Sequence, residues 1–220
     1  MNTLPQTQSA LTRLPTLRLE DDRIIVGSLL KYIDTRGGWL RHDGAPLRQG
    51  AQYLGLGTRR ALQRFVDQRP EIITERAGEK LPSADELNEK IPKEEWPIGL
   101  TGEPSPPWQL ERITYLIDVL DLTLFTYSAH TIGGTICTKD LESRWEWARA
   151  LYGSDVMPLF KLIEMPFPTA YGERKRPAFE IVGWRKFTEG ALRIVDQNAL
   201  ALESPKPKSL SADLKDNLPF

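Results

Sequence analysis

The chain has 220 residues, of which 40% are hydrophobic and 27% charged, so most of it can fold around a core. Its 29 Lys and Arg side chains nearly balance 30 Asp and Glu, and the net charge of −1 excludes a uniformly basic, histone-like binder. One cysteine and two histidines exclude an internal disulfide and a cysteine-rich zinc site. Because no apolar run approaches a membrane span and residues 1–19 lack a secretory pattern, we expect a soluble cytoplasmic protein.

Charge is distributed unevenly along the chain. Residues 1–80 carry a net charge of +4, whereas the remaining 140 carry −5. The overall neutrality therefore leaves room for a local basic groove. Residues 1–22 show no clear periodicity and are expected to form a flexible arm.

Residues 23–92 are predicted to contain a strand and two short helices. The β-branched run at residues 23–27 predicts the strand. Thr58 is a suitable N-cap for a helix over residues 59–66, which Pro70 would end and whose apolar face would carry Leu62, Phe65 and Val66. The capping-box pattern Ser83-Ala-Asp-Glu86 predicts a second helix that runs to Ile91.

The central part of the chain predicts a hairpin followed by a helix. Residues 113–120 and 122–127 are rich in β-branched and aromatic side chains and lie almost back to back, which is typical of an antiparallel hairpin. Gly133-Gly134 interrupts this pattern. A helix is predicted from Thr138 to Tyr152, with Gly153 as its C-terminal stop.

Two further strands are predicted at residues 159–163 and 179–184, joined by a loop that contains residues 171–177. A helical pattern then runs through Leu192, Val195, Ala199 and Leu202. Residues 204–212 are rich in Pro, Ser and Lys and are expected to form a flexible linker to the last eight residues.

In chain order these elements are strand, strand, helix, strand and strand, an α+β arrangement. The oligonucleotide-binding fold, a five-stranded β-barrel with its helix between strands three and four, has this order. We therefore predict such a barrel over residues 93–203, closed by the last helical pattern. Its fifth strand would come from residues 96–100 or 23–27, and residues 23–92 either join the barrel or form a separate helical addition.

The last eight residues combine acidic side chains with one aromatic anchor. A mobile peptide of this kind can place its ring in an apolar pocket while basic residues bind the adjacent carboxylate. The alternative interpretation is that these residues are a frayed terminus without a function, which ends in Phe by chance. The residues expected to contact a partner protein are Asp213, Asp216, Leu218, Pro219 and Phe220.

This segment resembles the acidic tip of bacterial single-stranded-DNA-binding proteins, which ends in Pro-Phe and follows a linker. Leu218, Pro219 and Phe220 match the tip, whereas Lys215 and Asn217 dilute its acidic run. The resemblance implies a partner among replication, recombination or repair proteins. Residues 94–184 are similar instead to uncharacterised proteins of prophages and mobile elements. The segments that carry this similarity are Glu95-Trp-Pro-Ile-Gly, Pro106-Pro-Trp108, Phe125-Thr-Tyr127, Gly133-Gly134 and Pro177-Ala-Phe-Glu-Ile-Val-Gly-Trp184.

A single-strand groove needs aromatic faces that stack on bases and cations that follow the phosphates. Strand aromatics at alternate positions and a basic loop beside a tyrosine provide candidates for both, although aromatic residues in strands are also typical of a core. The predicted nucleic-acid-binding residues are Tyr115, Phe125, Tyr127, Tyr171, Arg174, Lys175, Arg176, Trp184, Arg185 and Lys186. A further basic group, Arg59, Arg60 and Arg64, would supplement the groove or form a solvated helical face.

The sequence offers no arrangement typical of an enzyme. His130 and Cys137 lack metal-ligand spacing, and Cys137 is interpreted as a small buried hydrophobe. His42-Asp43 precedes Gly44 and is interpreted as an exposed turn. No glycine pattern matches a phosphate-binding loop. We expect no catalytic residues, no metal and no cofactor.

The sequence therefore predicts a protein of phage or mobile-element type that binds single-stranded DNA with little sequence preference and recruits partner proteins through its tip. The alternative is a protein-interaction adaptor or inhibitor that mimics the tip and binds no DNA, and a nuclease is a more distant third hypothesis. A continuous positive groove favours DNA, whereas scattered basic residues favour the adaptor. The sequence does not indicate the oligomeric state of the protein or a preference for DNA over RNA.

Overall fold

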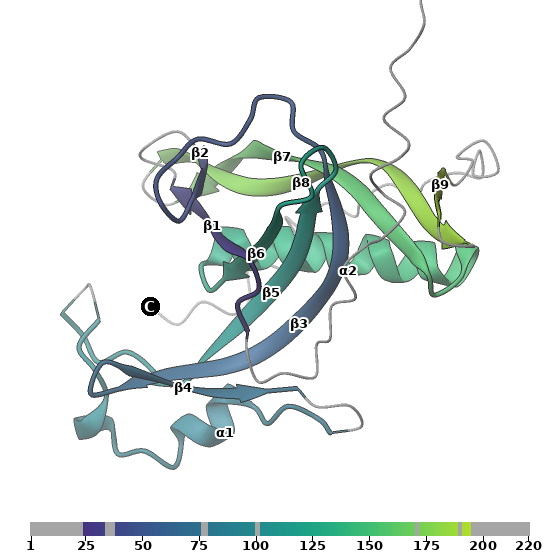
Figure 1. The fold of residues 1–220 in the computed structure, drawn as a ribbon. Coiled ribbons are helices and arrows are strands. Elements are labelled where there is room, and N and C mark those ends of the chain that lie inside the picture. Colours follow the sequence, from purple (N-terminus) through teal and green to yellow (C-terminus); the bar gives the residue numbers. More distant parts are fainter. Residues whose placement is uncertain are drawn as a thin grey trace, which may run out of the picture.

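The computed structural model describes residues 24–33, 38–75, 79–99, 102–169, 172–188 and 191–194, which form a mixed α+β structure (Figure 1). Within these residues one long helix packs against an extended, strongly curved sheet. The strands are β1 (Ser28–Ile33), β2 (Gly38–Arg41), β3 (Tyr53–Val66), β4 (Arg69–Thr74), β5 (Gln109–Asp118), β6 (Leu124–Ala129), β7 (Val156–Thr169), β8 (Gly172–Thr188) and β9 (Ala191–Ile194). The helices are α1 (Ala84–Asn88) and α2 (Ile132–Tyr152), with a 3₁₀ turn at Lys93–Glu95.

The described strands form one sheet in the order β2-β1-β6-β5-β3-β7-β8-β9, with β4 paired to β3. All neighbours are antiparallel except β1 and β6, which run parallel. This sheet is not closed into the predicted five-stranded barrel. Strands from residues 23–92 belong to it, because β3 lies between β5 and β7.

The main core is aromatic and lies between the inner face of the sheet and α2. Trp39 makes an edge contact with Tyr127, with ring centroids 4.8 Å apart, and a tilted contact with Phe179 at 5.8 Å. The buried residues of this cluster include Leu30, Tyr53, Leu116, Phe125, Cys137, Leu141 and Phe160. A smaller cluster forms on the outer face of the sheet, where Ile24 packs on Ala61, Ile113 and Tyr115.

Several predictions from the sequence are confirmed. The central hairpin is present as β5 and β6, which pair from Arg112↔Ala129 to Ile117↔Leu124. Ser83 caps α1 by accepting a hydrogen bond from the amide of Asp85. Gly153 ends α2 with a φ of 103°, a backbone region that favours glycine.

The long helix begins at Ile132, six residues before the predicted start, because Thr131 caps it by accepting from the amide of Gly134. The two glycines therefore lie inside its first turn. Gly134 is required there by close packing, since a Cβ at this position would lie 2.8 Å from the hydroxyl oxygen of Tyr127.

The helix predicted over residues 59–66 is wrong, because this segment is the second half of β3. It pairs with β5 on one side and with all six residues of β4 on the other. These long-range hydrogen bonds override a local pattern compatible with a helix. Residues 23–27 and 96–100 likewise contribute no strand in the described part of the chain.

The predicted loop over residues 171–177 is also wrong. Residues 172–177 belong to β8, which pairs with β7 from Val156↔Lys186 to the hairpin tip at Thr169↔Gly172. After Trp184, β8 runs on to Thr188 and residues 191–194 form β9, so the first part of the last predicted helix is wrong. Residues 195–202 lie outside the described residues, as do the linker and the tip. No helix in the described ranges is long and apolar enough to cross a membrane.

Candidate nucleic-acid interface

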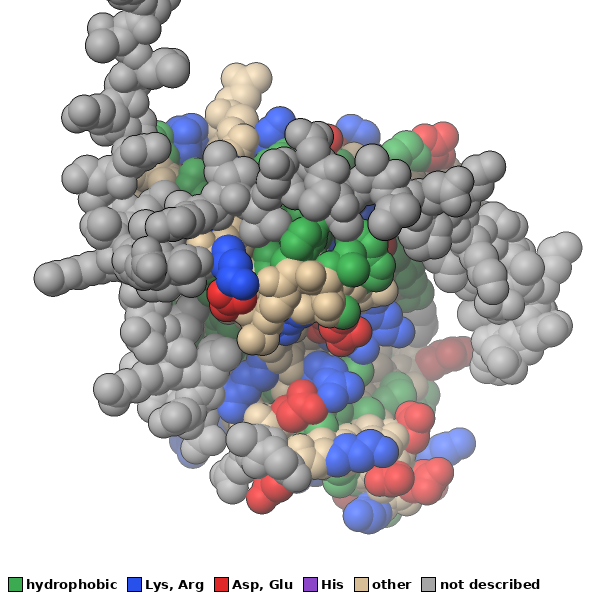
Figure 2. Space-filling model, turned by 90° about the vertical axis from the view of Figure 1, so that its right-hand side faces the viewer, with side chains coloured by type: hydrophobic (Ala, Val, Ile, Leu, Met, Phe, Trp, Pro, Cys, Tyr) green, Lys and Arg blue, Asp and Glu red, His purple; other side chains and the backbone are tan. Residues whose placement is uncertain are grey.

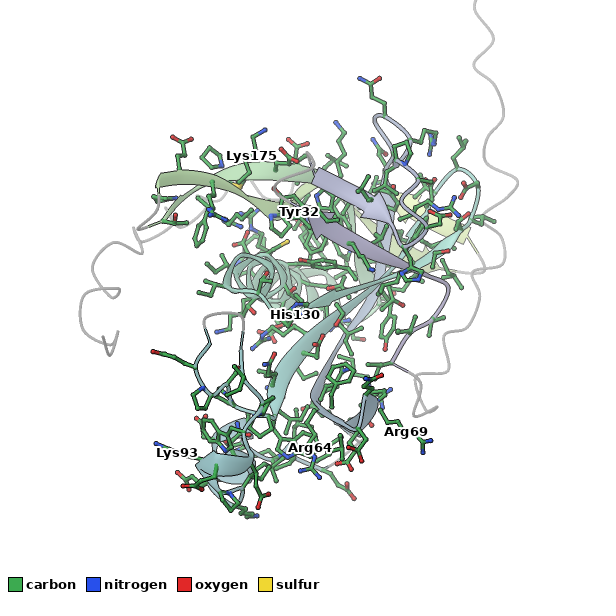
Figure 3. The ribbon with its side chains drawn as sticks, turned by 90° about the vertical axis from the view of Figure 1, so that its left-hand side faces the viewer. Tyr32, Arg64, Arg69, Lys93, His130 and Lys175 are labelled. Carbon is green, nitrogen blue, oxygen red and sulfur yellow. The ribbon has the colours of Figure 1, made fainter. Side chains whose placement is uncertain are left out.

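A groove of about 510 Å³ lies on the outer face of β5 and β6, and we call it the outer groove. Strand β1 forms one wall with Lys31 and Tyr32, and the far end of β3 forms the other with Gln63 and Phe65. The floor contains alternate residues of β5 and the end of β6, among them Gln109, Glu111, Ser128 and His130. In Figure 3, His130 lies between Lys175 on the β7–β8 hairpin and Arg64 near the lower end of β3.

Phe65 is the most exposed aromatic side chain among the described residues, with 66% of its surface accessible. It is exposed because β3 continues past the core to pair with β4, where Phe65 lies opposite Pro70. Gln63, two residues earlier, points to the same side of the sheet. The ring therefore presents an open face at the wall of the outer groove. The apolar spacing of the sequence predicted instead that Phe65 lies on the apolar face of a helix.

The N-terminal segment before β1 closes one end of the groove. The Thr126 hydroxyl accepts from the amide of Val26 at 2.8 Å and donates to its carbonyl at 2.7 Å. The Tyr115 hydroxyl donates to the Ile24 carbonyl at 3.2 Å. These bonds hold residues 24–26 across β5 and β6, so the groove is open on the side of β3 and His130.

Four of the five rings predicted to bind nucleic acid are buried, so the prediction is wrong for Tyr115, Phe125, Tyr127 and Trp184. Their accessible fractions are 1%, 5%, 4% and 7%, so none offers a face to a base. Tyr127 and Phe125 point into the main core, and burial raises the pKa of the Tyr127 hydroxyl far above its usual value. Trp184 packs with Trp145 and Val156. Tyr115 is on the outer face instead, where the Ile24 segment covers it.

The predicted basic cluster lies near the tip of the β7–β8 hairpin. In the strand register Arg174 lies opposite Phe167 and Arg176 opposite Met165, so these four side chains share one face. Lys175 is on the other face and forms a 2.9 Å ion pair with Glu164. A Cβ on Gly133 would lie 3.0 Å from the Cβ of Arg176, which places Arg176 beside the first turn of α2.

The remaining predicted residues do not join this cluster. Arg185 donates to the Trp184 carbonyl, and Lys186 pairs with Asp155 at 3.0 Å. Arg185 comes nine positions after Arg176 on the same strand, which corresponds to about 30 Å along β8. Tyr171 and the tip residues Asp213, Asp216, Leu218, Pro219 and Phe220 lie outside the described residues.

The basic group at residues 59–64 lies on β3 rather than on a helix. Arg60 forms a bidentate pair with Glu75, and Arg64 pairs with Glu71 while its guanidinium stacks over Trp108. Both cations are therefore matched by carboxylates. The surface seen in Figure 2 shows the same mixture, with basic and acidic side chains interspersed.

The groups considered for catalysis do not form a reactive site in the described part of the chain. Cys137 is buried in the main core, and burial raises the pKa of its thiol far above the usual value, so it stays protonated. Among the described residues no cluster of three or more His, Cys, Asp or Glu side chains is suited to a metal ion.

Comparison of the chain with protein-family models, curated proteins and solved structures finds no match.

Proposed function

We propose that this protein binds single-stranded DNA in the outer groove through an oligonucleotide-binding type of core. The strand order supports this proposal. The strands β6-β5-β3-β7-β8 are adjacent and antiparallel, and α2 connects β6 to β7. If β3, β5, β6, β7 and β8 correspond to the five barrel strands in chain order, the helix follows the third strand as the fold requires.

The position of the groove is the observation that carries the proposal. In this fold, oligonucleotides bind on the face of the second and third strands, between the loops that follow strands one and four. In the proposed correspondence these two strands are β5 and β6, whose outer face forms the floor of the groove. The two loops become the long β3–β5 connection and the β7–β8 hairpin, which carries Arg174 and Arg176.

The β1–β2 hairpin accounts for the absence of a closed five-stranded barrel. It attaches to the free edge of β6 and reaches the opposite side of the core, where the Trp39 indole donates to the Ile163 carbonyl of β7 at 2.9 Å. The hairpin thus occupies the gap between β6 and β8, the third and fifth strands of the proposed barrel. It also adds Lys31 to the wall of the groove.

Binding would combine base stacking with phosphate neutralisation. Phe65 offers the stacking face, and Lys31 is an exposed cation that forms no ion pair within the described residues. Arg174 and Arg176 extend the cationic side toward the hairpin tip. Because single-strand binding displaces counterions, affinity should fall steeply as salt rises.

Titration of a labelled mixed-sequence oligonucleotide of about 20 nucleotides at low salt tests this proposal. Anisotropy should show saturable binding, and Lys31→Ala should reduce the slope of log K against log salt by about 0.7. Lys139→Ala, which removes an exposed lysine of α2, is the matched control and should leave the slope unchanged. Absence of binding at micromolar protein would overturn the proposal.

The tip is part of the proposal. Asp213, Asp216 and Leu218-Pro219-Phe220 would recruit a replication, recombination or repair protein to the bound strand. Deleting Phe220 should abolish binding to a receptor of the bacterial tip while leaving oligonucleotide affinity unchanged. Loss of both activities, or of neither, would contradict this division of roles.

The alternative adaptor function is favoured by the pairing of surface charge. Nine Lys or Arg side chains in the described part of the chain lie within 4.0 Å of a carboxylate, which leaves scattered rather than continuous positive charge. An adaptor would bind the tip receptor in competition with a bacterial tip peptide and would not shift the anisotropy of any oligonucleotide. The titration above therefore separates the two functions.

A further inference from the structure

A carboxylate lies at the floor of the outer groove, where a site for phosphates would carry a cation. Glu111 is on β5 between Gln109 and Ile113, and all three line the groove. Its neighbour across the sheet is Ala61 of β3, whose small side chain does not cover it. The Glu111 side chain is 12% exposed, so it lies low in the groove and is not a solvated surface group.

Within the described residues, one of its two oxygens accepts a hydrogen bond. The Ser128 hydroxyl donates to Oε2 from the adjacent strand β6. Oε1 is 3.8 Å from His130 Nδ1, beyond hydrogen-bond distance, and no hydrogen bond to it is formed by the described residues. Glu111 therefore presents an acceptor oxygen toward the groove and offers no donor.

This arrangement determines how a single strand would lie. A carboxylate repels phosphates, so the backbone must follow the rim near Lys31 while the bases point to the floor. A base over the floor then presents its polar edge toward Glu111. The exocyclic amino groups of cytosine and adenine can donate to a carboxylate. The ring N3–H of thymine is its one donor, and it lies between two carbonyl oxygens that repel a carboxylate, so thymine is the poorer partner.

We propose that Glu111 makes the outer groove prefer strands rich in cytosine or adenine over strands of thymine, by accepting a hydrogen bond from the exocyclic amino group. The inference rests on the proposed function and specifies the substrate class of the same site. Gln63 and Gln109, which also line the groove, carry both donor and acceptor groups and do not discriminate in this way.

The test compares labelled oligo-dC, oligo-dA and oligo-dT of equal length by anisotropy at one salt concentration. A charge-assisted hydrogen bond predicts about ten-fold tighter binding of oligo-dC than of oligo-dT. Glu111→Gln should bring this ratio close to one. Glu146→Gln removes the same charge from an exposed residue of α2 that forms no ion pair within the described residues, and it should keep the wild-type ratio.

A second measurement changes the probe and not the protein, so it does not depend on the folding of a variant. An oligo-dC analogue whose bases lack the exocyclic amino group should bind wild-type protein about as weakly as oligo-dT. Equal affinity for dC and dT, a ratio that persists in Glu111→Gln, or tight binding of the analogue would each overturn the role of Glu111. Binding of none of the oligonucleotides would overturn the proposed function itself.

Discussion

The exposed ring of Phe65 gives the sharpest test of the outer groove. About two thirds of this side chain is accessible, so Phe65→Ala removes little buried surface. Full burial of a phenylalanine is worth about 1.5–3 kcal/mol, and the buried third predicts a loss of stability of about 0.5–1 kcal/mol. The folded protein should therefore survive the substitution almost unchanged.

The effect on nucleic-acid binding should be much larger. Stacking of one base on an aromatic side chain contributes about 1–3 kcal/mol, which corresponds to about a five- to 150-fold loss of oligonucleotide affinity. Anisotropy titration of the variant at low salt measures this loss, and urea denaturation measures the stability of the same preparation.

Trp147 provides the matched control. It is the other strongly exposed ring among the described residues, at 44%, and it lies on α2, outside the groove. Trp147→Ala should leave affinity unchanged. If Phe65→Ala bound as tightly as wild type, or if Trp147→Ala lost as much affinity, the reasoning that places bases on Phe65 would be refuted.

Three further outcomes test the core and its titrating groups. Phe125→Ala should lower the free energy of unfolding in urea by about 3–5 kcal/mol, while the folded variant should bind oligonucleotide as tightly as wild type. A stable variant that bound weakly would show that Phe125 contacts nucleic acid. Cys137 should react with iodoacetamide only after unfolding, because burial raises its thiol pKa; rapid labelling of native protein would contradict its burial. Burial, opposed by Arg112, raises the pKa of Glu142 above its usual 4.5, so the folded state binds this proton more tightly than the unfolded state. The protonated carboxyl therefore contributes stability below pH 4.5, and this contribution is lost as pH rises through the raised pKa. Glu142→Gln should remove this pH dependence of the free energy of unfolding, measured by denaturation at several pH values.

Local signals in the sequence predicted the elements that are stabilised locally. The β5–β6 hairpin, the cap at Ser83 and the stop at Gly153 depend on residues close in the chain, and all three are present. The segment 59–66 was assigned wrongly, because its conformation depends on pairing with β5, which is about 50 residues away at Arg60↔Arg112. Helical spacing of apolar residues carries no information about that partner.

The site was predicted less well than the fold for a related reason. Alternation shows that Tyr115 and Phe125 point to opposite faces of their hairpin, but it does not show which face is covered. Tyr115 is covered by the Ile24 segment and Phe125 by the main core, so both faces are buried at these positions. Phe65 and Glu111 become groove residues only through the pairing of β3 with β5, which an aligned set of related sequences could have indicated through covariation.

Photo-crosslinking tests the central claim most directly. Full-length protein is saturated with a single-stranded oligonucleotide that carries photoreactive bases, irradiated, digested and mapped by mass spectrometry. Binding in the outer groove predicts crosslinks in the peptides that contain Phe65 and Gln109–Glu111, the wall and the floor of the groove. Crosslinks restricted to α2 or to the Trp184–Lys186 end of β8, with none in these peptides, would contradict the account.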